Sequence, residues 1–295
     1  MYGEVRVWDA EIVVDEELAR RLIGSQFPEL QLRSLRHLAE GWDNTVWVAN
    51  GELALRFPRR AIAVPLIERE LEFLPLLAPL LPLPIPVPTH VGRAGAEFPW
   101  PFFGAQLIPG REVADAEVNP VKLGAQLGAF LRALHDVKIE FALPDDANRR
   151  ADMSVRVPMA RKELSELGGL SDEVESVLDA ALDLPTPNAT VVAHGDLHLR
   201  HALIGPDGGL SGVIDWGDAC RADPSVDMSL YWSLLSDDGR EAFLSAYGPV
   251  TDEQMLRARV LALGLGAMIA TYARHERLPR LERAARAGLR RAAAE

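Results

Sequence analysis

Two residue types are scarce in this chain of 295 residues. Cysteine occurs once, at Cys220, so neither an internal disulfide nor a zinc site built from several cysteines can form. Lysine occurs only at Lys122, Lys138 and Lys162, so a cationic contact made by the first 121 residues must come from arginine or histidine. Arginine can make such a contact, because its guanidinium stays charged and bonds phosphate oxygens in a fixed fork.

The sequence also lacks the marks of a secreted, membrane-spanning or nucleic-acid-binding protein. Its most apolar stretch, residues 74–88, carries six prolines, which would break a membrane-spanning helix. The amino terminus has no basic segment followed by an apolar one, so no signal peptide is predicted. The formal charge of −12 repels nucleic acid and anionic membranes. We therefore expect a cytoplasmic protein whose partners include neither nucleic acid nor membrane.

The first third of the chain follows strand patterns. Residues 32–58 alternate in three runs, and the Asn50-Gly51 turn predicts a hairpin between the second and third runs. Residues 66–77 predict a helix from which Glu70 can project toward the sheet. The expected apolar face of this helix consists of Leu66, Leu71, Leu74 and Leu77. A further strand over residues 98–107 leads into Ile108-Pro109-Gly110, a turn-rich candidate hinge.

Beyond the candidate hinge the pattern becomes mainly helical. Helices are predicted over residues 119–137, 150–168 and 171–184, and again from Pro224 onward. Short strands are predicted within residues 191–204 and 210–216. With 48% hydrophobic residues the chain can bury a large core. We expect a sheet-rich lobe over residues 1–105, a hinge over residues 106–110 and a helical lobe over residues 111–295.

One loop combines the side chains that phosphoryl transfer requires. Residues 194–201, His-Gly-Asp-Leu-His-Leu-Arg-His, place a carboxylate at Asp196 and a metal-capable imidazole five positions later at His201. Asp215 follows 19 positions after Asp196, at the end of a predicted strand. In phosphoryl transfer, one Asp orients the attacking hydroxyl and accepts its proton, while two other ligands hold Mg²⁺ on the nucleotide phosphates.

These motifs resemble those of the aminoglycoside phosphotransferase family, protein-kinase-like enzymes that phosphorylate small molecules. The family pattern is His-Gly-Asp-x-x-x-x-Asn followed by Ile-Asp-x-Gly, with His201 in the last place of the first motif here. The resemblance implies an α+β bilobal protein-kinase-like fold, with a small antiparallel-sheet lobe and a larger, mainly helical lobe. It also implies transfer of the γ-phosphoryl of ATP or GTP, with Mg²⁺, to a hydroxyl of an aminoglycoside- or macrolide-like antibiotic.

By the same resemblance, Asp196 is the catalytic base, and Asp215 and His201 are the metal ligands. His198 stands where protein kinases carry a lysine near the transferred phosphoryl, so it could supply part of that positive charge. An imidazole at position 201 prefers softer metals than Mg²⁺. A histidine there nevertheless resembles the aminoglycoside 2″- and macrolide 2′-phosphotransferase branches, in which GTP is often used.

The resemblance places the nucleotide contacts in the first lobe and the hinge. Arg56 occupies the third-strand position where kinases place a phosphate-binding lysine, and Glu70 is its expected ion-pair partner, with Glu68 as the alternative. The loop over the phosphates and the backbone groups facing the purine complete the set: Gly41, Asp43, Asn44, Thr45, Gln106, Leu107 and Ile108.

Several residues near the motif have alternative interpretations. His194, His198 and His201 could form a zinc cluster, although the interleaved Asp196 favours phosphoryl transfer. His194 is expected to bond the loop backbone. Asp227, at the start of a predicted helix, is expected to cap and anchor, and the resemblance implies that it supports the 194–201 loop. Asp218 is either a surface residue or a contact to substrate or metal.

The acceptor is less well defined than the reaction. Residues 106–273 hold 26 Asp and Glu against 14 Arg and Lys, a charge that would attract a cationic acceptor but that solubility alone also explains. The alternatives to an antibiotic kinase are a housekeeping kinase of a sugar, amino alcohol or related metabolite, and an inert nucleotide-binding regulatory module.

Overall fold

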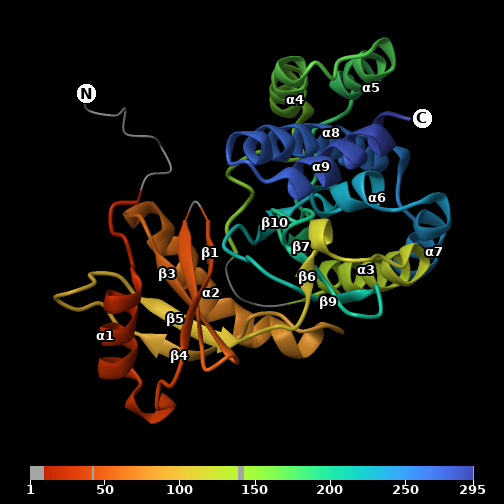
Figure 1. Cartoon of the computed structure of the whole chain (residues 1–295). Helices are drawn as coiled ribbons and strands as arrows, with labels where there is room; N and C mark the ends of the chain where they lie inside the picture. Colours follow the sequence, from red (N-terminus) through yellow and green to blue (C-terminus); the bar gives the residue numbers. More distant parts are fainter. Residues whose placement is uncertain (1–9, 42, 139–142, 295) are drawn as a thin grey trace, which may run out of the picture. The chain divides into compact units, whose positions relative to one another are not determined.

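The computed structural model describes residues 10–41, 43–138 and 143–294, and these fall into two compact units (Figure 1). The first unit comprises Met1–Pro79 and Ile85–Ile108, and the second comprises Leu80–Pro84 and Pro109–Glu295, apart from the residues outside those described ranges. Each unit is considered on its own below.

The first unit is a five-stranded antiparallel sheet in the order β1-β2-β3-β5-β4. The Asn50-Gly51 turn joins β2 to β3, and both of its residues have positive φ values, 54° and 78°. An Asn-Gly pair adopts this conformation readily, which is why the hairpin forms where the sequence predicts it. The strands are β1 (Leu35–Glu40), β2 (Asn44–Ala49), β3 (Leu53–Pro58), β4 (Pro88–Gly92) and β5 (Phe102–Gln106).

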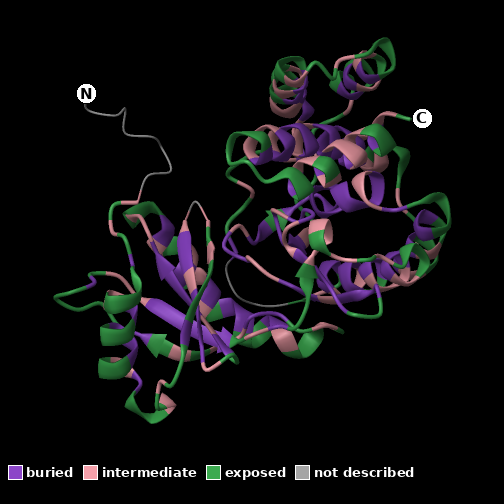
Figure 2. Ribbon diagram, viewed as in Figure 1, coloured by how far each residue is buried: buried purple, intermediate pink, exposed green. Residues whose placement is uncertain are grey.

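Successive residues of this sheet face two different apolar clusters. Phe57 and Phe102 pack with residues of α1 (Glu16–Gln26), whereas Phe103 packs with Ile67 of α2 (Val64–Leu77). This alternation follows from the two-residue period of a strand. It makes the central strands β3 and β5 largely buried, as the purple ribbons in Figure 2 show. Arg56, one position before Phe57, therefore lies on the α2 side.

The buried face of α2 differs from the predicted one. Leu66 and Leu71 are only half-buried, whereas Ile67 and Phe73 are fully buried. The stripe that faces the sheet runs through Ile67, Glu70, Leu74 and Leu77 at spacings of three and four. Glu70 is thus at the centre of the buried face rather than beside it.

The second unit is mainly helical, as predicted. The expected helices and strands between residues 119 and 213 are present, with small sheets in the orders β10-β7 and β6-β8-β9. Its elements are β6 (Arg111–Glu112), α3 (Pro120–His135), α4 (Met153–Leu167), α5 (Asp172–Leu182), β7 (Val191–Ala193), β8 (Ala202–Ile204), β9 (Leu210–Val213), β10 (Cys220–Ala222), α6 (Ser229–Ser233), α7 (Asp237–Tyr247), α8 (Asp252–His275) and α9 (Pro279–Ala293).

Helix α8 is, within the described part of the chain, long and apolar enough to cross a membrane by length and composition. However, 61% of its apolar window is buried inside the protein, where it packs against α4 and α9. Its arginines Arg257 and Arg259 are buried too, and they donate to the backbone carbonyls of Pro185 and Ala292. The burial of α8 and of its arginines indicates that α8 is a core helix of the second unit.

Candidate active site

The 194–201 loop begins where β7 ends, and a glycine fixes its course. Gly195 has a φ of +87°, and a Cβ on it would lie 2.2 Å from the carbonyl oxygen of Asp218. A left-handed backbone and such a close approach both require glycine. The glycine of the His-Gly-Asp motif therefore lets the segment that carries Asp196 lie directly against the segment that carries Asp218.

Asp227 supports this loop from a fully buried position, as the family resemblance implies. Its two carboxylate oxygens accept the backbone N–H groups of His194, at 2.8 Å, and Gly195, at 3.0 Å. Nε2 of His135 lies 3.2 Å from Asp227 Oδ2, and Nδ1 of the same ring lies 2.8 Å from the hydroxyl of Tyr247. Burial opposes the charged carboxylate, but these hydrogen bonds and the charge of His135 hold the pKa of Asp227 below its ordinary value.

The hydrogen bonds of the histidines assign their tautomers. His194 accepts the N–H of Asp196 on Nδ1, at 3.2 Å, and donates from Nε2 to the carbonyl of Ile214, at 3.0 Å. Both of its nitrogens are therefore used by the loop backbone, which confirms the structural role predicted for His194. His201 donates from Nδ1 to the carbonyl of Asp196, at 2.8 Å. The lone pair of its Nε2 then faces Asp215 Oδ2 at 3.3 Å.

This pair of atoms fits a metal ion. A nitrogen lone pair and a carboxylate oxygen so close together repel each other unless a cation lies between them. The backbone carbonyl on the other ring nitrogen fixes the orientation of the imidazole, as it does in many metal sites. His201 and Asp215 are therefore the residues of this loop region that would hold a divalent cation.

A second group of possible ligands fits less well. Asp196, His198 and His201 have ligand atoms within 4.8 Å of one another. However, His198 accepts the N–H of Arg200 on Nδ1, at 3.3 Å, so its Nε2 carries the proton of the neutral ring. Nδ1 of His201 is used by the Asp196 carbonyl, and His194 has no nitrogen to spare. The tautomers thus disfavour this trio, and they disfavour a three-histidine zinc cluster for the same reason.

The surroundings of His198 oppose the positive charge expected on it. Burial, together with the charge of Arg200, lowers the pKa of His198 to about 3. Burial and the neighbouring His198 ring, stacked with centroids 3.8 Å apart, lower the pKa of His201 to about 4. Both rings are neutral at pH 7, so His198 offers only an N–H group, on a nitrogen 3.6 Å from Asp196 Oδ2.

Asp196 has the properties of a general base. Its side chain is 31% exposed, so a substrate can reach it. The remainder of the side chain is buried, and this burial raises the pKa of Asp196 to about 6. His201 lowers that pKa, whereas the negative charge of Asp218 raises it further. A carboxylate with this pKa is ionised at neutral pH and accepts a proton more readily than an ordinary Asp.

Asp218 is paired with an arginine that sequence reasoning missed. Its carboxylate bonds Nη2 of Arg150, and Nη1 of Arg150 lies 2.8 Å from Asp146 Oδ1. No motif surrounds Arg150 or Asp146, which lie in the irregular segment before α4. Their position near the loop follows from tertiary contacts alone.

In the first unit, Arg56 and Glu70 come together as predicted from the sequence. Nη1 of Arg56 lies 3.1 Å from Oε1 of Glu70, which is completely buried. The alternative partner, Glu68, is exposed. The guanidinium also lies over the ring of Phe103, 5.9 Å from its centroid. These contacts fix the Arg56 side chain at the position expected to bind phosphate.

The loop between β1 and β2 is shorter than predicted. Asn44 and Thr45 are buried residues of β2, where they pair with Pro58 and Phe57 of β3. They therefore belong to the strand and not to the loop. Asp43 bonds Nη2 of Arg60 at 2.5 Å rather than presenting a free carboxylate. The carbonyl of Gly41 accepts from Arg59 at 2.5 Å, and residue 42 lies outside the described residues. Arginines that follow β3 thus hold this loop in place.

At the predicted hinge, one backbone group is already engaged. The N–H of Leu107 donates to the carbonyl of Glu52 at 2.7 Å. Gln106 ends β5, and Ile108 is the last residue of the first unit. The amide of Leu107 is therefore unavailable to a purine, and the predicted contacts are confined to its carbonyl and to the backbone of Gln106 and Ile108.

Comparison with known proteins agrees with this geometry. The model of the phosphotransferase enzyme family (APH) matches residues 34–260. The chain belongs to this family. A stretch of 61 residues is 36% identical to the uncharacterized protein YcbJ of Bacillus subtilis (strain 168), covering 21% of this phosphotransferase and about a fifth, 20%, of YcbJ.

Solved structures show that this phosphotransferase has the predicted kinase-like fold. The GDP and kanamycin complex of APH(2″)-IIIa matches with a TM-score of 0.69 and 21% identity, over 94% of this chain and 98% of that one. The macrolide 2′-phosphotransferase MphH from Brachybacterium faecium matches with a TM-score of 0.61 and 22% identity, over 92% and 98%. The α+β architecture, with an antiparallel-sheet unit and a mainly helical unit, is thereby confirmed.

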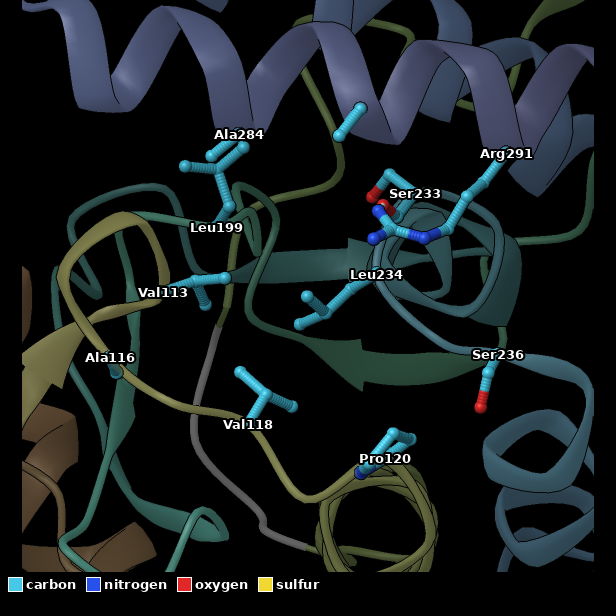
Figure 3. Close-up of a pocket in the computed structure, with 11 residues that line it drawn as sticks. Val113, Ala116, Val118, Pro120, Leu199, Ser233, Leu234, Ser236, Ala284 and Arg291 are labelled. Atoms are coloured by element: carbon cyan, nitrogen blue, oxygen red, sulfur yellow. The ribbon is translucent and has the colours of Figure 1, made fainter.

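The second unit of this phosphotransferase also contains a cavity of about 320 Å³ that borders the 194–201 loop at Leu199 (Figure 3). Val113, Val118 and Leu234 give it an apolar lining, and Arg291 adds a positive charge. Its described lining residues include no carboxylate. This cavity therefore does not suit the amino groups of a cationic acceptor.

Proposed function

We propose that this protein transfers the γ-phosphoryl group of ATP or GTP to a hydroxyl of a small molecule. The observation that carries the proposal is the double role of Asp196. Its carboxylate is exposed enough to meet a hydroxyl, while its carbonyl orients His201 toward Asp215. One residue thus links a general base to a metal-binding pair, as phosphoryl transfer requires.

In the proposed reaction, the acceptor oxygen bonds to the γ-phosphorus as the bond to the bridging oxygen of the nucleoside diphosphate breaks. Asp196 orients the acceptor hydroxyl and receives its proton. Asp227 keeps Asp196 in place by holding the two backbone N–H groups that precede it. Mg²⁺ held by Asp215 and His201 would offset the charge of the nucleotide phosphates. In the first unit, Arg56, fixed by Glu70, would bind phosphate oxygens.

For the acceptor, we propose an aminoglycoside- or macrolide-like antibiotic. Support comes from the acidic balance of residues 106–273, which attracts cations. The similar APH(2″)-IIIa structure holds kanamycin, and MphH is named a macrolide 2′-phosphotransferase.

The test is phosphoryl transfer from ATP and from GTP, with Mg²⁺, to a panel of aminoglycosides and macrolides. The mass of the intact acceptor should increase by one phosphoryl group. Asp196→Ala should abolish transfer while leaving nucleotide affinity nearly unchanged. Asp207→Ala serves as the control, because Asp207 is exposed and pairs with Lys122. An Asp196→Ala variant that kept most of the wild-type rate would refute the assignment.

A further inference from the structure

The 194–201 loop offers little positive charge to a transferring phosphoryl group. His194 and His198 each accept a backbone N–H on Nδ1, so neither ring carries a second proton in this arrangement, and Nδ1 of His201 donates to the carbonyl of Asp196. The remaining cation, Arg200, is engaged elsewhere: its Nε lies 3.4 Å from Glu112, and its guanidinium lies over the ring of Tyr272, 5.6 Å from the centroid. Within the second unit, a side-chain cation near Asp196 is therefore to be sought in another segment.

Arg150 provides such a charge. Its Nη2 bonds Asp218, whose backbone packs against Gly195, the residue that immediately precedes Asp196. Its Nη1 lies 2.8 Å from Asp146. The side chain is only 14% exposed. Burial opposes its charge, but the negative charges of Asp218, Asp146 and Asp196 together raise the pKa of Arg150, and the first two of these carboxylates bond the guanidinium directly.

The segment that carries Arg150 is anchored to the same small sheet as the 194–201 loop. The N–H of Asp146 donates to the carbonyl of Arg221 in β10 at 3.1 Å, and Arg221 donates to the carbonyl of Pro144 at 2.8 Å. The N–H of Arg150 itself bonds the Asp146 carboxylate. Because β10 pairs with β7, these bonds fix Arg150 relative to the start of the loop. A charge fixed before the reaction needs no reorganisation during it.

We propose that Arg150 is the positioning residue that offsets the carboxylates beside Asp196 and so lets the negatively charged phosphoryl group approach the acceptor hydroxyl. This role rests on the proposed function. Without Arg150, the carboxylate of Asp218 would lose its guanidinium partner, and its negative charge beside the segment that carries Asp196 would oppose the incoming phosphoryl oxygens. The proton still passes to Asp196, and the bonds that form and break are those given above.

The test compares Arg150→Ala with Arg149→Ala. Arg149 is the neighbouring residue in the same segment, but it is 60% exposed and pairs with Asp152. We expect Arg150→Ala to lower kcat by about 10- to 100-fold, with KM for the nucleotide changed by less than about 2-fold. Arg149→Ala should leave both constants near the wild-type values. Added guanidinium should restore part of kcat in Arg150→Ala and have no such effect on Arg149→Ala.

A double variant separates this role from simple bracing of the segment. Asp218→Asn removes the charge that Arg150 offsets, so Arg150→Ala with Asp218→Asn should be faster than Arg150→Ala alone. A loss caused only by a loosened segment would not recover in this way. A readout without turnover is calorimetric binding of inorganic phosphate to the metal-free protein, which should weaken in Arg150→Ala and stay unchanged in Arg149→Ala.

The outcomes for the two proposals are distinguishable. A wild-type protein without Asp196-dependent transfer would overturn the proposed function and this role with it. A wild type that transfers phosphoryl groups, while Arg150→Ala keeps its kcat or fails to recover with both guanidinium and Asp218→Asn, would overturn the role of Arg150 alone.

Discussion

At the scale of single residues, the backbone carbonyl of Asp196 explains how a histidine can occupy the last place of the motif. The carbonyl binds the Nδ1–H of His201, so the Nε2 lone pair points at Asp215. Burial keeps the ring neutral, which preserves that lone pair at physiological pH. In the proposed function, a neutral, oriented imidazole nitrogen would thus take the place of the amide oxygen of the family motif.

The raised pKa of Asp196 predicts how activity depends on pH. Asp196 acts as a base only when ionised, so kcat/KM should fall as the pH drops through about 6. His198 and His201 have lower pKa values and should add no further loss above about pH 5. Steady-state rates measured between pH 5 and 8 check this. Asp218→Asn should lower the pH at which kcat/KM falls, because the negative charge of Asp218 contributes to the raised pKa of Asp196. A rate that stays constant down to pH 5 would contradict the assignment of Asp196 as the base.

Some site residues could be predicted from the sequence, and others could not, for identifiable reasons. Arg56 and Glu70 were predictable as a pair because each lies on a regular element whose period sets the direction of its side chain. Asp43 pairs with Arg60, which lies 17 residues away along the chain, and Arg150 pairs with Asp218, which lies 68 residues away. The Arg residues of these pairs lie in irregular segments, where no period indicates a direction.

At the scale of elements, α3 and α7 pack backbone against backbone. A Cβ on Gly124 would lie 2.0 Å from the carbonyl oxygen of Gly239, and one on Gly128 would lie 2.4 Å from that of Phe243. Two glycines four residues apart share one face of α3, so α7 can approach it along a full turn. This approach is what brings His135, at the end of α3, to Tyr247, at the end of α7.

A glycine substitution in α3 should therefore be costly, whereas one in α1 should not. Gly128→Ala must push α7 away and should lower the free energy of unfolding by about 1–3 kcal/mol. Gly24→Ala, in the exposed part of α1, meets no atom within 4 Å and should raise it by about 0.5–1 kcal/mol. Urea unfolding of both variants checks this pair. Equal effects of the two substitutions would argue against tight α3–α7 packing.

The His135 ring should connect this helix pair to the 194–201 loop. His135→Leu removes a donor from the buried Asp227 carboxylate, which should cost about 1–3 kcal/mol of stability. The backbone N–H groups of His194 and Gly195, which Asp227 holds, should then exchange with solvent faster. His135→Gln keeps a donor at the Nε2 position and should recover much of both effects. Unchanged exchange in His135→Leu would show that Asp227 holds the loop without His135.

The elements of both units were largely predictable because their hydrophobic periods are strong. β4 was not, since it starts at Pro88 in a proline-rich stretch and its only partner in the sheet is β5. β6 and β10 have two and three residues, too few to show a period. The direction of Glu70 in α2 was predictable, but part of the apolar face was not, because α2 is rich in leucine on several sides and Ile67 and Phe73 are buried in place of Leu66 and Leu71.

At the scale of the whole molecule, charge is unevenly distributed along the chain. Residues 106–273 contain 26 acidic and 14 basic residues, so this stretch carries the whole of the formal charge of −12. If the acceptor is cationic, kcat/KM for it should fall as the salt concentration rises from about 0.05 to about 0.5 M, while kcat changes little. An uncharged acceptor measured in parallel should show no such fall. Equal salt dependence for both acceptors would indicate that the charge serves solubility.

The Arg56–Glu70 pair has a consequence for chemical labelling. Reagents that mark the nucleotide site of kinases, such as acyl phosphates of nucleotides and sulfonyl fluorides, react with the amine of a lysine. Arg56 stands at that position, and its guanidinium stays protonated and does not act as a nucleophile. With no lysine before Lys122, the first unit contains no side-chain amine for such reagents. Amine-directed covalent reagents would therefore find no lysine at the Arg56 position, and reagents selective for guanidinium groups, such as dicarbonyls, would be needed to label it.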